Sequence, residues 1–169
     1  MKKEILIGAA MALFSTPAFA DTASWVGVSG GIDLSSGEGF GVARAGVDTT
    51  ISNGAFVGLA LGAGESGSKD CAGLACAYGG RELAAELRLG GMNKTGWKFY
   101  GIAGYSSLHI TVKSGALNLG SVTEGGFTGG AGVEAPLGSK TFARLEYRYS
   151  DYGGGDHVSS IMPTIGFKF

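Results

Sequence analysis

The fold is decided by the last nine residues of the chain, Ile161-Met-Pro-Thr-Ile-Gly-Phe-Lys-Phe169. Counting back from the terminus, every second residue is apolar or carries a ring: Phe169, Phe167, Ile165, Pro163 and Ile161. The residues between them are Lys168, Gly166, Thr164 and Met162. Alternation of period two is the pattern of a β-strand whose two faces meet different surroundings. We therefore predict a terminal strand with Phe167 and Phe169 on its apolar face.

The other end of the chain has the three parts of a secretory signal peptide. Two lysines are followed by the apolar residues 5–14, and Ala18-Phe-Ala20 forms a small-x-small cleavage site. This apolar stretch is too short for a membrane-spanning helix, which needs roughly 20 residues. We predict that residues 1–20 are a signal peptide and that residues 21–169 form one exported domain.

The composition of the exported domain argues against two classes of protein, nucleic-acid binders and collagen. Without residues 1–20 the chain keeps 11 basic and 13 acidic residues, a net charge of −2, whereas nucleic-acid binders usually carry a basic patch. The 33 glycines follow no three-residue period, which excludes collagen. Many of them lie within alternating apolar runs, where ordinary strands avoid glycine. A narrow closed barrel explains them, because large interior side chains need small neighbours.

Eight alternating segments can be marked in the exported domain, at about residues 25–33, 40–49, 55–63, 80–90, 97–112, 124–137, 142–152 and 158–169. Segments of about ten residues suit tilted transmembrane strands. Short, turn-like connections (50–54, 92–96 and 138–141) alternate with a second set that includes the long stretches 64–79 and 113–123. This arrangement predicts an all-β, eight-stranded antiparallel transmembrane up-and-down β-barrel with short periplasmic turns and longer outward loops. The pattern leaves the phase of segment 97–112 open.

Charged residues in the segments alternate with apolar ones. A barrel in lipid turns its polar face inward, whereas a soluble barrel would turn Leu87 and Leu145 inward. The interior of eight strands is only wide enough for side chains, and an unpaired buried charge costs several kcal/mol. Instead of a charged channel lining, we therefore predict an ion-paired core made of Arg44, Glu82, Glu86, Arg88, Glu134, Arg144, Glu146 and Arg148.

Rings near the segment ends favour lipid over water as the outer surrounding. They are Trp25, Trp97, Phe99, Tyr147, Tyr149, Tyr152, Phe167 and Phe169. Membrane barrels carry such rings as girdles at both membrane interfaces, so we expect these eight rings to lie on the outer surface.

Two stretches, Gly129-Gly-Ala-Gly-Val-Glu134 and Ala143-Arg-Leu-Glu-Tyr-Arg-Tyr-Ser-Asp-Tyr-Gly153, resemble the small barrels of the opacity-protein and related outer-membrane β-barrel domain family. The resemblance implies an integral protein of the cell outer membrane with a packed polar interior and surface loops. It does not imply one shared activity. It also implies that Phe167 and Phe169 belong to the signal read by the barrel-assembly machinery. The expected role is structural or one of surface interaction, as in porin-like surface antigens, with no large pore. Expected partners are outer-membrane lipid, the assembly machinery and a host or envelope surface partner.

Three further features of the sequence bear on chemistry. Because the predicted compartment is oxidising, Cys71 and Cys76 are expected to form a disulfide. A metal site would need further ligands nearby, and Asp70 alone is a poor case for one. The pair His157-Val-Ser159 resembles the lipid A deacylases, but in that family an acidic residue follows the pair, and none follows Ser159 here. The glycine-rich runs lack the strand, turn and helix of a phosphate site, so no cofactor or metal is predicted.

The alternatives to a non-enzymatic membrane barrel are a lipid A deacylase-type enzyme and a soluble periplasmic barrel that binds an apolar ligand.

Overall fold

A computed structural model describes residues 22–66, 69–72, 75–114, 117–152 and 157–169. The predicted signal peptide lies outside these residues. The strands are β1 (Thr22–Asp33), β2 (Gly39–Ser52), β3 (Ala55–Ser66), β4 (Lys69–Ala72), β5 (Ala75–Met92), β6 (Lys98–Ser114), β7 (Leu117–Pro136), β8 (Thr141–Asp151) and β9 (His157–Lys168). Among the described residues, no helix has the length and hydropathy that crossing a membrane requires.

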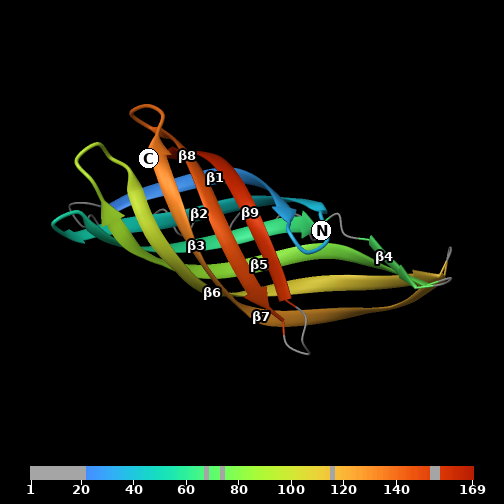
Figure 1. Ribbon diagram of the computed structural model, residues 1–169. Helices are drawn as coiled ribbons and strands as arrows, with labels where there is room; N and C mark the ends of the chain where they lie inside the picture. Colours follow the sequence, from blue (N-terminus) through green and yellow to red (C-terminus); the bar gives the residue numbers. More distant parts are fainter. Residues whose placement is uncertain (1–21, 67–68, 73–74, 115–116, 153–156) are drawn as a thin grey trace, which may run out of the picture.

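The strands form one closed antiparallel barrel (Figure 1). Their order is β3-β2-β1-β9-β8-β7-β6-β5-β4, and an additional pairing of β3 with β5 closes the ring. Eight strands therefore make the wall, as predicted, and the short β4 adds to β5 outside it. The β2–β3 turn uses Asn53 (φ 48°) and Gly54 (φ 81°), the left-handed pair that a tight hairpin requires.

The two long connections predicted at residues 64–79 and 113–123 are largely β-structure, so this part of the prediction was wrong. Strands β5, β6 and β7 continue well past the point where β8 ends, and the extended part is visible in Figure 1. Their Gly- and Ser-rich sequence is typical of a loop, but pairing with neighbouring strands satisfies the backbone hydrogen-bonding groups. We call this extension the projecting sheet, formed by β4 and residues 75–80, 108–114 and 117–126.

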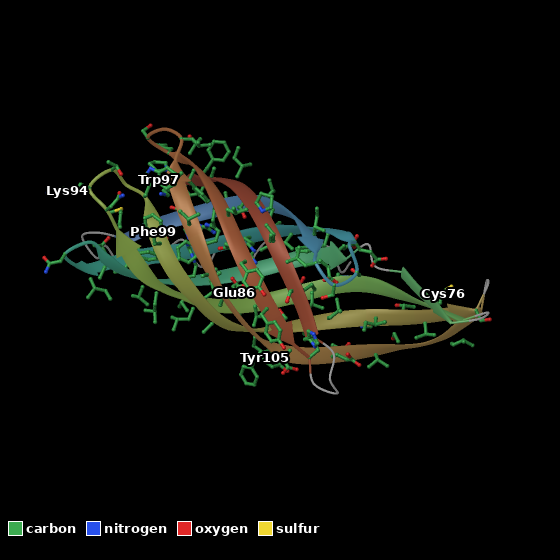
Figure 2. All side chains as sticks on the ribbon, in the orientation of Figure 1. Cys76, Glu86, Lys94, Trp97, Phe99 and Tyr105 are labelled. Atoms are coloured by element: carbon green, nitrogen blue, oxygen red, sulfur yellow. The ribbon has the colours of Figure 1, made fainter. Side chains whose placement is uncertain are left out.

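The predicted phase of the wall is confirmed by side-chain exposure. Leu87 and Leu145 are 38% and 50% exposed, whereas the side chains of Glu86 and Glu146 are buried. The soluble-barrel alternative required these two leucines inside, and it is wrong. The structure also sets the phase of β6, which turns Tyr100 inward and Phe99 outward. Figure 2 shows Trp97 and Phe99 near the same end of the barrel as Lys94.

Two of the eight rings expected on the outer surface lie inside. Trp25 is 1% exposed and meets Phe142 edge-on with ring centroids 6.0 Å apart. Tyr152 is half-buried, and its hydroxyl accepts a hydrogen bond from Ser106. Gly46 makes room for the indole, because a Cβ there would lie 2.6 Å from Cζ2 of Trp25. The face of the wall on which a ring lies is decided by the parity of its residue along the strand and not by its distance from the strand end.

Candidate functional site

The candidate site is the barrel interior and the end of the lumen that lies away from the short turns. Near the short turns, four rings surround two guanidinium groups. Cζ of Arg144 lies 4.0 Å from the ring centroid of Trp25, and Cζ of Arg88 lies 4.1 Å from that of Tyr100. Such cation–π contacts strengthen when both partners are shielded from water. The other two rings of this layer are Phe56 and Phe142.

Carboxylates at the same depth complete the charge balance. The side chain of Glu134 is fully buried and its Oε2 lies 2.7 Å from Nη2 of Arg144, while its Oε1 lies 2.8 Å from Nζ of Lys168. Asp48 receives Arg88 at 2.9 Å and Lys98 at 2.6 Å. Each buried charge thus has a partner of opposite sign, which burial requires.

A second ion-paired layer lies farther from the turns. Nη1 of Arg44 lies 2.6 Å from Oε2 of Glu146, and Nη2 of Arg148 lies 2.9 Å from the same atom. Glu86 also pairs with Arg148, and it lies 3.3 Å from Arg44. The hydroxyl of Tyr100 donates to Glu146 at 2.7 Å. These contacts join β2, β5, β6 and β8 across the lumen, and Figure 2 labels Glu86 within the barrel.

Three members of these layers are not among the predicted interior charges: Asp48, Lys98 and Lys168. Asp48 alternates in phase with Arg44, so parity alone could have included it. Lys98 belongs to the strand whose phase the sequence left open. Lys168 alternates with the lipid-facing Phe167 and Phe169, so parity places it on the inner face, but the sequence does not show which carboxylate it meets.

Glu82 differs from the other seven predicted charges. It is half-buried and lines a small hollow of about 100 Å³ at the end of the lumen away from the short turns, together with Arg148 and Tyr152. Among the described residues, no basic side chain lies within salt-bridge distance of its carboxylate. Beside this hollow, hydroxyls form a chain from Tyr152 through Ser106 and Thr128 to Ser150.

Taken together, the ion-paired layers occupy the lumen between the turns and the hollow. The described interior holds six basic side chains and five acidic ones, counting Glu82 and the partly exposed Lys168. They are Arg44, Arg88, Lys98, Arg144, Arg148 and Lys168, with Asp48, Glu82, Glu86, Glu134 and Glu146. Packed charges of both signs hold the wall together and narrow the path for solutes.

The other predicted residues lie outside the lumen. His157 is exposed and its ring stacks on Tyr149, and Ser159 accepts a hydrogen bond of 3.4 Å from the hydroxyl of Tyr147. Cys71 on β4 stands directly opposite Cys76 on β5, and Figure 2 places Cys76 near the tip of the projecting sheet. This register agrees with the expected disulfide, which stays a prediction. Phe167 and Phe169 are 56% and 70% exposed on the outer surface.

Comparison with known proteins points to one family. Residues 6–169 match the family model described as outer membrane protein beta-barrel domain. A 25 kDa outer-membrane immunogenic protein of Brucella ovis is 39% identical over 70 residues, which cover 41% of this chain. The aligned part spans 34% of that relative's length.

Solved structures show the same fold at low sequence identity. The attachment invasion locus protein Ail of Yersinia pestis, in complex with the heparin analogue sucrose octasulfate, aligns with a TM-score of 0.65 at 14% identity, covering 88% of this chain and 97% of Ail. The N-terminal β-barrel domain of OprF from Pseudomonas aeruginosa aligns with a TM-score of 0.59 at 18% identity, covering 88% and 98%. Neisserial surface protein A aligns with a TM-score of 0.51 at 16% identity, covering 87% and 94%.

Proposed function

The chain belongs to the outer membrane protein beta-barrel domain family, and we propose that it serves in the cell outer membrane as a structural or surface-interaction protein without a large pore. The projecting sheet is the observation that carries the proposal. Strands β5, β6 and β7 run past the end of β8, so they extend the wall beyond the length that neighbouring strands need. The extended part therefore lies outside the lipid, where it can contact another molecule.

The filled interior supports the second half of the proposal. Porins with an aqueous channel use 16–18 strands, whereas this wall has eight and its lumen contains two ion-paired layers. A solute would have to displace Arg44 and Glu146, whose contact is 2.6 Å. Breaking a buried pair is costly because it leaves an uncompensated charge.

We propose four features of its partners. The exposed apolar residues of the wall, such as Leu59 and Phe127, contact outer-membrane lipid. The exposed Phe167 and Phe169 serve the barrel-assembly machinery during insertion. A host or envelope protein binds at the outer end, and nucleic acid is not a partner. The name of the Brucella ovis relative, an immunogenic outer-membrane protein, supports the view that this chain too is a surface antigen.

We do not propose an enzyme. The hydroxyl of Ser159 is engaged by Tyr147, and the ring of His157 stacks on Tyr149. Contacts of this kind are typical of polar and aromatic groups at a membrane interface, where one end of a Tyr or Trp side chain is in apolar surroundings and the other is solvated.

Cysteine labelling on intact cells tests the surface role. In a Cys71→Ser/Cys76→Ser background, Thr123→Cys on the projecting sheet should react with a membrane-impermeant maleimide. Thr95→Cys, in a short turn, should react only after the cells are lysed. Both threonines are exposed. Labelling of Thr95→Cys alone before lysis would show that the barrel has the opposite orientation in the membrane. Absence of labelling at both cysteines before lysis would argue against surface exposure. In planar bilayers, the purified barrel should show no porin-sized conductance.

A further inference from the structure

The hollow at the end of the lumen away from the short turns is large enough for a small molecule. Its volume is about 100 Å³, the space of roughly three water molecules at about 30 Å³ each. Ser36, in the connection between β1 and β2, lines the hollow and is exposed. The hollow therefore reaches the surface of the protein beside this connection, while Arg44 and Arg148 line it on the side of the ion-paired interior.

The charges around the hollow do not balance. In the second ion-paired layer, Arg44 pairs with Glu86 and Glu146. Arg148 pairs with the same two carboxylates, so these four side chains carry no net charge as a set. Glu82 lines the hollow as an additional carboxylate, and it has no salt-bridge partner among the described residues. One negative charge is thus left over at the hollow.

The surroundings of Glu82 supply no compensating positive charge. Its cross-strand neighbours are Gly64 and Leu108, and neither is basic. Asp33 and Glu38 also line the hollow, so they add negative charge to it. Apart from the two paired arginines, the described residues that line the hollow include no basic side chain. A concave site lined by charges of one sign concentrates ions of the opposite sign, so the hollow favours a cation.

An organic ammonium ion suits the hollow better than a metal ion. Calcium and magnesium take six or more oxygen ligands, and the described residues contain no group of three or more His, Cys, Asp or Glu side chains placed to hold a metal. A protonated amine has only three N–H donors. The carboxylate of Glu82 and the hydroxyls of Ser150 and Ser160, which also line the hollow, are acceptors of the kind that it needs.

Arg44 indicates a second polar group on the ligand. Its side chain is only 3% exposed, and its Nε is a buried atom without a hydrogen-bond partner. A buried N–H without an acceptor is costly, and an oxygen of a ligand in the hollow that Arg44 lines would supply one. A hydroxyl suits this position better than a carboxylate, because Glu86 and Glu146 already hold the other nitrogens of Arg44 and would repel a further negative charge.

We propose that the hollow binds a small, positively charged amino alcohol. The protonated amine lies against the carboxylate of Glu82, and the hydroxyl oxygen accepts a hydrogen bond from Nε of Arg44. The space of roughly three water molecules limits the ligand to about four bonded non-hydrogen atoms, since bonded atoms lie closer together than separate molecules. The site goes beyond the surface role proposed above and does not depend on it.

Equilibrium dialysis of radiolabelled ethanolamine against the purified mature barrel, in micelles of a nonionic detergent, tests the proposal. The buffer is phosphate at neutral pH, because many amine buffers are themselves amino alcohols. We expect saturable binding of one ethanolamine per barrel. Unlabelled ethylamine should compete about tenfold more weakly, because it lacks the hydroxyl that accepts from Arg44. O-phosphoethanolamine should also compete at least about tenfold more weakly, because Asp33 and Glu38 repel its phosphate.

A matched pair of variants tests the role of Glu82. Glu82→Gln keeps the size of the side chain and removes its charge, so it should weaken ethanolamine binding about tenfold. Since Glu82 takes part in no printed-length ion pair of the interior layers, the variant should fold, and heat-modifiable migration on a detergent gel checks this. Glu65→Gln makes the same change at an exposed residue that does not line the hollow, and it should bind like the original protein.

The competition series uses the unaltered barrel, so it decides the proposal even if a variant fails to fold. Absence of saturable binding, equal competition by ethylamine or O-phosphoethanolamine, or unchanged binding by Glu82→Gln would each overturn it. Displacement of ethanolamine by an equal concentration of calcium chloride would also overturn it, because the hollow would then be a site for an inorganic cation. Failure of Thr123→Cys to react on intact cells would refute the surface role alone, so the two proposals fail separately.

Discussion

Arg44 on β2 and Glu146 on β8 are 102 residues apart in the chain, and their Nη1 and Oε2 atoms lie 2.6 Å apart across the barrel interior. Neither side chain contacts water to any extent, with exposed fractions of 3% and 0%. The pair links two strands that are not neighbours in the wall, and Arg148 and Tyr100 add two more contacts to the same carboxylate. Glu146 is therefore the best place to test how much the interior charges contribute to stability.

Glu146→Ala should lower the free energy of unfolding by about 3–5 kcal/mol, because Arg44 and Arg148 would keep their buried charge without this partner. The measurement is urea unfolding of the barrel in lipid vesicles. The double variant Arg44→Leu/Glu146→Leu should lose less than the sum of its single variants, since it removes both charges together. Unchanged stability of Glu146→Ala would contradict its burial.

Gly46→Ala should destabilise the barrel by about 1–3 kcal/mol, the usual cost of overpacking. The new Cβ would lie 2.5 Å from the backbone oxygen of Leu59 and 2.6 Å from Cζ2 of Trp25. Gly41→Ala is the matched control on the same strand, because its nearest neighbour would be the oxygen of Ser29 at 4.0 Å. Equal unfolding midpoints for the two variants would argue against an indole inside the wall.

Phe169→Ala should reduce the amount of folded protein in the outer membrane several-fold while leaving the refolded barrel almost as stable as the original. The ring is 70% exposed, so it contributes little to the packed interior, and its proposed role lies in assembly. The readout is heat-modifiable migration of membrane fractions on detergent gels. Leu145→Ala, at a lipid-facing position that is 50% exposed, should assemble at a normal level. A large loss of stability after refolding of Phe169→Ala would assign the ring a structural role instead.

Cys71→Ser/Cys76→Ser should leave the unfolding midpoint of the barrel unchanged and increase cleavage of the projecting sheet by added protease. The two cysteines are cross-strand neighbours on β4 and β5, so a bond between them closes a very short loop, and the stabilisation gained from a disulfide grows with the length of the loop that it closes. Thiol labelling with and without reductant establishes whether the bond forms. A lower midpoint for the barrel would mean that the hairpin supports the wall.

The alternation in residues 142–152 and 161–169 is sufficient to predict the membrane barrel and the side of each residue in β8 and β9. The reason is local: parity along a strand decides which face a side chain takes, and lipid and lumen demand opposite chemistry. The same rule, followed strictly, places Trp25 inside with Lys168, its cross-strand neighbour. The expectation of an outer ring followed from its position near a strand end, which carries no information about the face.

The ion partners and the projecting sheet required the tertiary structure. Arg44 pairs with Glu146, and Lys168 pairs with Glu134. These pairings depend on distances across the lumen between strands that are remote in sequence. The phase of β6 is fixed by its ladders with β5 and β7, because its own two faces are similar in hydrophobicity. The extension of β5, β6 and β7 depends on the same ladders, since Gly- and Ser-rich segments become strands only where a neighbour satisfies their backbone. The sequence by itself thus determined the wall and its two faces through a local period, while contacts between distant strands decided what fills the barrel and what projects from it.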